Sequence, residues 1–307
     1  MDRVKQYLRK IKVVASLYFI RLLNKIKPRR FISPSILLLS YPRSGSSWAG
    51  EILATSPQLA YLREPVTQPY LKRFGGEQAV FSAEDNHKDI SIYQKLADDA
   101  FGGVPSVHRG VVDHKRDFLP FSNATSQKLL IKEVNPAAAS FYCKHYKPFL
   151  LVLLRHPAAV ALSFHERGWL KRHSELLDGE SELDEWGRFG QLYGTFLADA
   201  VDVVNHYQNS KIIKYEALVN DPKQQYLDIF ADCGVGAPEG FDSVIEQYCY
   251  SKVDLSSGYQ TERNSKLTAE KWKNKLSIEQ INSLRKGFLD TRLDFYREPS
   301  DWLVSSD

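Results

Sequence analysis

The chain has 307 residues, 43% of them hydrophobic and 25% charged, so it can bury a large core and is neither disordered nor low in complexity. Its three cysteines are too few for a disulfide framework and form no Cys-x-x-Cys metal site, which favours a reducing compartment. The net charge is +4, but residues 1–30 contribute +9, so the remaining 277 residues are mildly acidic. This distribution argues against a broad nucleic-acid-binding surface.

Apolar residues recur at intervals of three or four along residues 1–30, which predicts a basic amphipathic helix. They are Val4, Leu8, Ile11, Ala15, Tyr18, Leu22 and Ile26. The longest apolar run, 13–20, is far shorter than the ~20 residues that cross a bilayer. Two interpretations remain open: the helix lies on an anionic membrane surface, or it packs against the domain with its basic face in water. We expect a cytoplasmic protein, with peripheral membrane contact as the open question.

Apolar runs of strand length alternate with helical patterns after residue 31, which predicts a single doubly wound α/β domain over 31–307 with a parallel central sheet. The predicted strands are 35–40, 128–134, 149–154 and 211–215, and the predicted helices are 46–54, 158–167, 184–207, 222–231 and a last helix that begins at a Ser277 capping box. Residues 72–127 are polar and rich in turns, so we expect an insertion that contacts the acceptor.

The strongest local signal is a buried strand that runs into a tight turn and then a helix, over residues 37–48. A glycine in the turn lets the backbone approach an anion, and the first N–H groups of the helix face it with the positive end of the helix dipole. The lysine of a Walker A loop is missing here. An ordinary turn with a solvated arginine is the alternative. We predict a phosphate site formed by Arg43, Ser44, Gly45, Ser46, Ser47 and Trp48.

A second anion site is predicted where the strand 149–154 ends at Arg155. A magnesium-dependent phosphotransferase would typically place an aspartate there to hold the metal. Ser163 follows eight residues later, about two turns into the next helix, so its hydroxyl and the guanidinium can converge on one phosphate. Taken alone, Arg155 could equally cap a neighbouring carbonyl. Together the two sites indicate a ligand with two separated phosphoryl groups.

Four segments in this order resemble the sulfotransferases that use 3′-phosphoadenosine 5′-phosphosulfate. They are Tyr41-Pro-Arg-Ser-Gly-Ser-Ser-Trp48, the stretch from Arg155 to Ser163, Lys214-Tyr-Glu-Ala-Leu218 and Lys271-Trp-Lys-Asn-Lys-Leu-Ser277, and they span about residues 35–277. The resemblance implies that this phosphosulfate is the donor substrate, that no metal takes part, and that a hydroxyl group is the acceptor.

The resemblance also assigns the donor site. Arg155 and Ser163 would hold the 3′-phosphate, and Trp48 and Tyr215 would flank the adenine, although both aromatics could equally belong to the core. Arg263 is the nearest counterpart of an arginine that reaches the 3′-phosphate in cytosolic members. It lacks the lysine and glycine that follow in that branch.

Sulfuryl transfer needs a cation at the leaving phosphate oxygen and a base near the acceptor proton. Arg43 suits the first role. The histidine that serves as base in cytosolic members is missing from Lys132-Glu-Val-Asn135, but Tyr61-Leu-Arg-Glu-Pro65 resembles the carbohydrate-modifying branch, whose Glu-Pro supplies the base. We therefore favour Glu64, with Glu133 as the alternative.

Lys132 is expected to assist the leaving group or to orient the acceptor. Alternation along the strand places Lys132 and Glu133 on opposite faces, so both cannot point into one site without a bulge. A salt bridge of Glu64 with Arg43 or Arg63 would lower the pKa of Glu64 and weaken it as a base.

The sequence thus predicts a sulfotransferase that acts on a hydroxyl, with a carbohydrate or glycolipid favoured and a phenol, alcohol or lipid left open. The alternatives are a P-loop nucleotide or small-molecule kinase and a non-catalytic membrane-associated nucleotide-binding protein. No nucleic-acid partner is expected, and the oligomeric state is left open.

Overall fold

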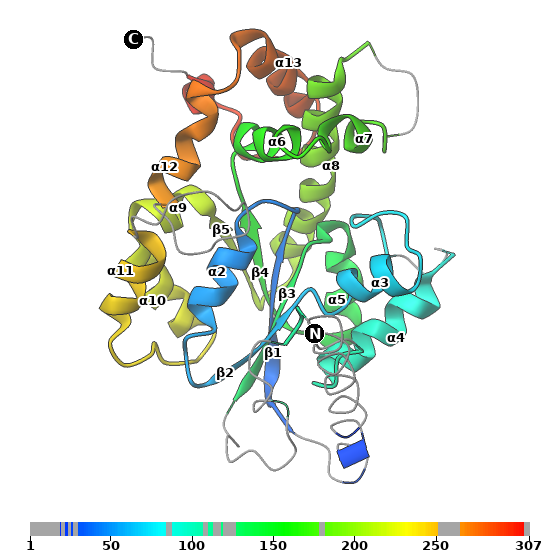
Figure 1. Cartoon of the computed structure of the whole chain (residues 1–307), viewed down its shortest axis with the longest axis vertical. Coiled ribbons are helices and arrows are strands. Elements are labelled where there is room, and N and C mark those ends of the chain that lie inside the picture. The colour runs from blue at the N-terminus through cyan, green and yellow to red at the C-terminus, as the bar shows by residue number, and fades with distance from the viewer. Residues whose placement is uncertain are drawn as a thin grey trace, which may run out of the picture.

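The computed structural model describes residues 30–83, 88–106, 110–112, 118, 127–177, 182–250 and 265–303, together with Phe19, Leu22, Leu23 and Ile26. These residues form a single α/β domain around one parallel sheet with the strand order β2-β3-β1-β4-β5 (Figure 1). The strands are β1 (Ile32–Ser40), β2 (Leu59–Arg63), β3 (Lys128–Glu133), β4 (Phe149–Leu154) and β5 (Ser210–Lys214). The predicted fold class is confirmed.

The central strand β1 lies between β3 and β4. Leu38 of β1 pairs with Lys132 of β3, and Ser40 pairs with Leu153 of β4, so the carboxyl ends of the three strands meet at one edge of the sheet. After β1 the chain forms β2 at one edge of the sheet and then β3 beside β1. It next crosses over β1 to form β4 and β5 on the other side, so the strand order reverses at β1. Ligands of open α/β sheets bind at such a reversal of strand order.

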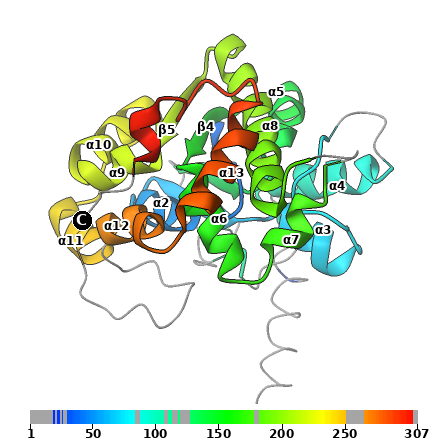
Figure 2. The same cartoon turned by 90° about the horizontal axis from the view of Figure 1, so that it is seen from above.

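Both faces of the sheet are covered, which explains why the inner strands are continuous apolar runs. Helices of the first face are α3 (Thr67–Arg73), α4 (Ile90–Phe101), α5 (Ala139–Tyr146), α6 (Pro157–His165), α7 (Leu170–Ser174), α8 (Glu185–His206) and α13 (Ile278–Leu289) (Figure 2). Helices of the second face are α2 (Ser46–Leu53), α9 (Tyr215–Asn220), α10 (Pro222–Asp232), α11 (Phe241–Cys249) and α12 (Ser265–Glu270). Three short 3-10 helices are η2 (Pro136–Ala138), η3 (Lys271–Asn274) and η4 (Pro299–Trp302).

The strands and helices predicted after residue 31 are confirmed, with boundaries that move by at most three residues. Two predicted helix starts have the expected caps. The Asp221 side chain accepts from the backbone N–H of Gln224, and Ser277 and Gln280 form a reciprocal capping box at the start of α13.

Among the described residues, the structure adds elements that the sequence pattern did not indicate: β2, α3, α4, α5, α7, α9, α11 and α12. Of these, α4 falls inside the polar stretch 72–127 and buries Tyr93 and Leu96 in the core of the first face. Part of that stretch is therefore packed into the domain. Its role in acceptor binding stays a prediction.

The predicted N-terminal helix falls largely outside the described residues. The four residues described there are helical, and Phe19, Leu22 and Ile26 have exposed side chains, at 58%, 56% and 76%. Within the described part of the chain, no helix is long and apolar enough to cross a membrane.

Candidate active site

The loop between β1 and α2 brings the backbone close to an aromatic ring. Gly45 precedes α2 with φ of 94°, and a Cβ atom there would lie 2.5 Å from Cε2 of Tyr215. No side chain caps the first turn of α2, and the hydroxyl of Ser40 donates to that of Ser46 at 2.7 Å. Because the first N–H groups of a helix have no acceptor within the helix, this turn is suited to bind an anion.

Arg43 connects the two predicted phosphate motifs. Its Nε donates to the hydroxyl of Ser163 on α6 at 2.9 Å, and its carbonyl accepts from Nη1 of Arg155 at 3.0 Å. The loop after β1 and the turn after β4 are therefore in direct contact. Binding of a ligand with two phosphoryl groups across them stays a prediction.

The Arg155 guanidinium is almost fully buried, with 5% of the residue exposed. Besides the Arg43 carbonyl it donates to the carbonyl of Thr268 at 3.0 Å, and it lies 4.4 Å from the centre of the Tyr215 ring. Arg155 thus caps carbonyls, as the alternative interpretation held, and its buried Nε is left without a hydrogen-bond partner among the described residues.

Two residues that the sequence analysis did not single out fix the backbone around Arg155. The Tyr193 hydroxyl donates to the Arg155 carbonyl at 2.5 Å, and the Glu216 carboxylate accepts from the backbone N–H of His156 at 2.9 Å and from the Tyr296 hydroxyl at 2.7 Å. Glu216 lies within the 214–218 segment, which is the signal that could have identified it. Nothing in the sequence around Tyr193 indicates its role.

His156 follows Arg155 and is the N-cap residue of α6. Its ring stacks on Trp272 of η3 with centres 4.5 Å apart, and its Nδ1 accepts from the backbone N–H of Ala158. Burial lowers the pKa of His156 to about 3, so the ring is neutral at physiological pH. The Trp272 segment is therefore packed against the same turn as Arg155.

The two aromatics predicted to flank an adenine are buried in the core. Trp48 and Tyr215 are 1% and 0% exposed and meet edge to face, with ring centres 5.4 Å apart. The indole N–H of Trp48 donates to the carbonyl of Tyr248. Contact of either ring with a nucleotide stays a prediction. Arg263 lies outside the described residues.

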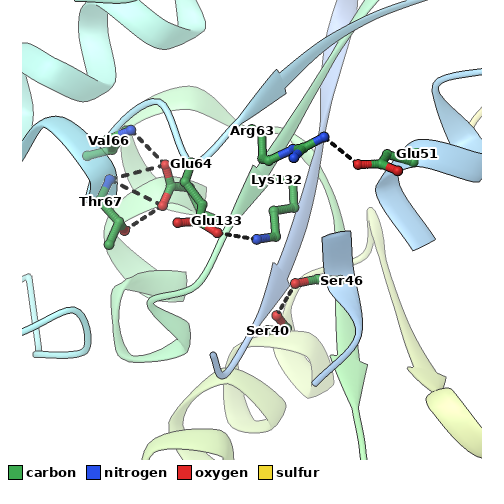
Figure 3. Close-up of polar contacts among 9 residues, drawn as sticks. All are labelled: Ser40, Ser46, Glu51, Arg63, Glu64, Val66, Thr67, Lys132 and Glu133. Atoms are coloured by element: carbon green, nitrogen blue, oxygen red, sulfur yellow. Dashed lines mark hydrogen bonds and ion pairs between the residues drawn. The ribbon is translucent and has the colours of Figure 1, made fainter. Parts of the chain in front are cut away.

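Glu64 and Lys132 form an ion pair at the carboxyl ends of β2 and β3 (Figure 3). Their Oε1 and Nζ atoms are 2.5 Å apart, and the side chains are 28% and 2% exposed. Burial raises the pKa of Glu64, but the positive charges of Lys132, Arg63 and Lys72 outweigh it, so the net pKa lies below its usual value. The partner of Glu64 is thus Lys132, whereas Arg63 pairs with Glu51 of α2.

Glu133 points to the other face of the sheet, where it meets the start of α3 (Figure 3). It is fully buried and accepts from the backbone N–H of Val66 and from the hydroxyl of Thr67. Burial raises the pKa of Glu133 to about 7. Of the two candidate bases, the geometry therefore favours the partly exposed Glu64.

No group of three or more histidine, cysteine, aspartate or glutamate side chains that could hold a metal ion occurs among the described residues. The donor set around the phosphate loop is made of arginine, serine and backbone N–H groups, which bind anions.

Comparison with known structures supports the fold. The sulfotransferase domain from the curacin biosynthetic pathway matches with a TM-score of 0.51 and 17% identity, over 86% of this chain and 100% of that chain. The sulfotransferase domain of the Synechococcus PCC 7002 olefin synthase matches with a TM-score of 0.49 and 18% identity, over 84% of this chain and 96% of that chain. A mouse sulfotransferase complexed with PAP matches with a TM-score of 0.46 and 14% identity, over 92% of this chain and 91% of that chain.

No curated protein matches the chain significantly. A family model described as a sulfotransferase domain matches residues 33–294, which include both phosphate motifs, Glu64 and Lys132. The chain therefore belongs to the sulfotransferase family and is an enzyme that transfers a sulfuryl group.

Proposed function

We propose that the enzyme moves a sulfuryl group from 3′-phosphoadenosine 5′-phosphosulfate to the hydroxyl of a carbohydrate or glycolipid. The observation that carries this proposal is the direct contact of the two phosphate motifs through Arg43, beside the ion pair of Glu64 and Lys132. One motif alone would suit many phosphorylated ligands. Two motifs in contact, built from arginines and serines, suit a nucleotide with phosphates at both ends of its ribose.

In this proposal the loop from Arg43 to Trp48 holds the 5′-phosphosulfate, and Arg155 and Ser163 hold the 3′-phosphate. The donor supplies an activated sulfuryl group, whose bond to the phosphate oxygen breaks as its bond to the acceptor oxygen forms. Arg43 stabilises the negative charge that develops on the leaving phosphate. Glu64 takes the acceptor proton, and Lys132 keeps the Glu64 carboxylate ionised and in place.

The low pKa of Glu64 has two effects on this chemistry. The carboxylate is ionised throughout the neutral range, so it is always able to accept a proton. It is also a weak base, which suits a reaction in which the proton leaves only as the acceptor oxygen bonds to sulfur. The preference for a carbohydrate acceptor rests on the resemblance of Glu64-Pro65 to the carbohydrate-modifying branch.

Calorimetry with adenosine 3′,5′-bisphosphate tests the donor site. We expect tight binding of this compound and weaker binding of 5′-AMP, which lacks the 3′-phosphate. Absence of binding, or preference for ATP with magnesium, would contradict the proposal and favour a phosphotransferase.

An acceptor screen with radiolabelled donor and saccharides, lipid extracts and phenols then identifies the substrate. Glu64→Gln should lose transfer on the order of 100-fold or more while still binding the bisphosphate, because it removes the base and leaves the phosphate motifs unchanged. A Glu64→Gln variant with normal kcat would exclude Glu64 as the base. Transfer to phenols alone would exclude the carbohydrate assignment.

We also propose that the protein works in the cytoplasm and contacts an anionic membrane surface through residues 1–30. Support comes from the +9 charge of this segment and from the exposed side chains of Phe19, Leu22 and Ile26. Basic charge attracts anionic lipid, and exposed apolar side chains enter the interface. A lipid-linked acceptor would lie within reach of such a protein.

Cosedimentation with vesicles tests this contact. We expect binding to vesicles that contain phosphatidylserine and none to neutral phosphatidylcholine vesicles. Replacing Phe19, Leu22 and Ile26 by serine should abolish it, while Ile278→Ser, at an exposed isoleucine of α13, serves as the matched control. Equal binding of the triple variant would contradict the proposal.

A further inference from the structure

The buried carboxylate of Glu133 ties the last residue of β3 to the start of α3. One oxygen accepts from the backbone N–H of Val66 at 2.7 Å, and the other accepts from the hydroxyl of Thr67 at 2.5 Å (Figure 3). The backbone N–H of Thr67 lies 3.3 Å from both oxygens. Because these hydrogen bonds are shielded from water, they hold the segment firmly.

The segment that Glu133 holds begins with Glu64. The backbone N–H of Glu64 donates to the Lys132 carbonyl at 2.7 Å, and the Glu64 carbonyl accepts from the N–H of Gln68 in α3 at 3.2 Å. Glu64 has φ of 49°, a left-handed conformation that residues other than glycine adopt rarely. Such a conformation persists only where the surroundings enforce it.

The last two residues of β3 supply these contacts from opposite sides of the strand. Lys132 holds the Glu64 side chain through its ammonium group and the Glu64 backbone through its carbonyl. Glu133 holds the residues two and three positions further along the chain. The turn 64–67 is therefore fixed at both its ends.

We propose that Glu133 is a positioning residue for Glu64: by clamping Val66 and Thr67, it keeps the Glu64 carboxylate against Lys132 and directed at the acceptor. This inference rests on the proposed function of Glu64 as the base. Glu133 itself is fully buried, and both its carboxylate oxygens accept hydrogen bonds from protein groups. It therefore does not face the substrate that would receive the sulfuryl group.

Two substitutions of Glu133 distinguish a positioning role from a role as the catalytic base. Glu133→Leu has no acceptor for Val66 and Thr67, whereas Glu133→Gln keeps one oxygen for the backbone N–H groups and an amide for the Thr67 hydroxyl. We expect Glu133→Leu to lower kcat on the order of 100-fold, because a shift of the base by about 1 Å has an effect of that size. Glu133→Gln should retain most of the wild-type kcat, and both variants should bind adenosine 3′,5′-bisphosphate normally.

The pH profile gives a readout that general damage to the fold would not produce. In Glu133→Leu the released Glu64 loses its close contact with Lys132, so the acid limb of kcat/KM should move to higher pH. In Glu133→Gln the limb should stay in place.

If Glu133→Leu does not fold, Thr67→Val tests the same clamp, since it removes only the hydroxyl donor. It should lower kcat several-fold, and Thr67→Ser should restore it. A folded Glu133→Leu with normal kcat would overturn the inference. So would a loss in Glu133→Gln as large as that in Glu64→Gln, because Glu133 would then be the base.

Amide hydrogen exchange distinguishes failure of this inference from failure of the proposed function. Exchange at residues 66 and 67 should be faster in Glu133→Leu than in the wild type and slow in Glu133→Gln. The exchange measurement needs no acceptor substrate. It therefore tests the clamp even if Glu64 proves not to be the base. Unchanged exchange in Glu133→Leu would overturn the clamp itself.

Discussion

Lys132 places an ammonium group inside the domain, with only 2% of its side chain exposed. Burial of a charge in this way is unfavourable unless a partner compensates it, and Glu64 provides that partner. The pair therefore has a structural and a chemical effect together. It fixes the position of the proposed base, and it sets the pH at which that base gains a proton.

Replacement of Lys132 by methionine should raise the pKa of Glu64, because burial then acts without the neighbouring cation. We expect the acid limb of the kcat/KM profile to move to higher pH and kcat to fall on the order of 100-fold. Lys128→Met, at the other end of the same strand, is the matched control, since its ammonium donates to the carbonyl of Cys233 at 2.6 Å and lies away from Glu64. An unmoved acid limb in Lys132→Met would contradict the role of the pair.

Glu133 gives the folded state a pH dependence of its own. Its pKa of about 7 lies above the ordinary 4.5, so the folded protein binds this proton more tightly than the unfolded chain does. The free energy of unfolding should therefore fall as pH rises from 4.5 to 7, by roughly 3 kcal/mol from this group, and then level off. Denaturant unfolding of Glu133→Gln should show a smaller decrease over this range; an equal decrease would assign it to other groups.

At the scale of the element, the start of α2 depends on the glycine that precedes it. Gly45 has both a left-handed φ and a ring packed against its Cα, so a side chain meets two obstacles there. The second obstacle arises because Tyr215, at the start of α9, closes over the turn. The turn, the helix and the ring are one packing unit.

Gly45→Ala should lower the free energy of unfolding by about 2 kcal/mol or more and weaken binding of adenosine 3′,5′-bisphosphate, because the turn must shift away from Tyr215. Gly240→Ala separates the two causes. Gly240 precedes α11 with φ of 68° but has no atom within 4 Å of the added Cβ, so only the backbone effect remains. Equal effects of both substitutions would show that the ring contact does not matter.

The sequence predicts the long apolar strands and the capped helices, because their signals are local. The order of the strands and the contact between Arg43 and Ser163 follow from packing across 120 positions, although two anion motifs at strand ends already indicate one ligand. β2 was missed because its five residues, Leu59–Arg63, include no valine, isoleucine or threonine, whereas β5 contains two isoleucines. α4 was missed because its buried side chains are few and lie within a polar stretch.

For the site, residue type and position in a motif select Arg43, Gly45, Arg155 and Glu64 as candidates, and their roles stay predictions. Partners chosen by tertiary packing could not be predicted in the same way. The sequence suggested Arg43 or Arg63 as the partner of Glu64, and the structure places Lys132 there. Strand alternation did predict that Lys132 and Glu133 face opposite sides, because that depends on the pleat alone.

At the scale of the whole molecule, the two phosphate motifs come from distant parts of the chain. The loop after β1, the turn after β4 and the segment around Thr268 meet at the Arg155 guanidinium. A ligand that binds the loop after β1 and the turn after β4 adds contacts between distant parts of the chain that exist only in the folded state. Ligand binding should therefore stabilise the entire domain.

Adenosine 3′,5′-bisphosphate at 100 times its dissociation constant should raise the free energy of unfolding by about 2.7 kcal/mol. At the same concentration 5′-AMP should raise it less, since it reaches only the first motif. In Ser163→Ala the advantage of the bisphosphate should shrink, as measured by denaturant titration with each nucleotide. An equal effect of both nucleotides on the wild type would show that the second motif does not bind the 3′-phosphate.

Arg43, like Glu64, has a positive φ, at 69°. Glycine at position 43 would remove that conformational cost and keep the carbonyl that accepts from Arg155, whereas glycine at position 64 would leave the buried Lys132 without its counter-ion. Laboratory evolution for heat resistance alone would thus tolerate glycine at the first position, at the loss of the hydrogen bond to Ser163, and reject it at the second. An arginine at position 43 therefore carries a backbone cost that its proposed part in turnover offsets.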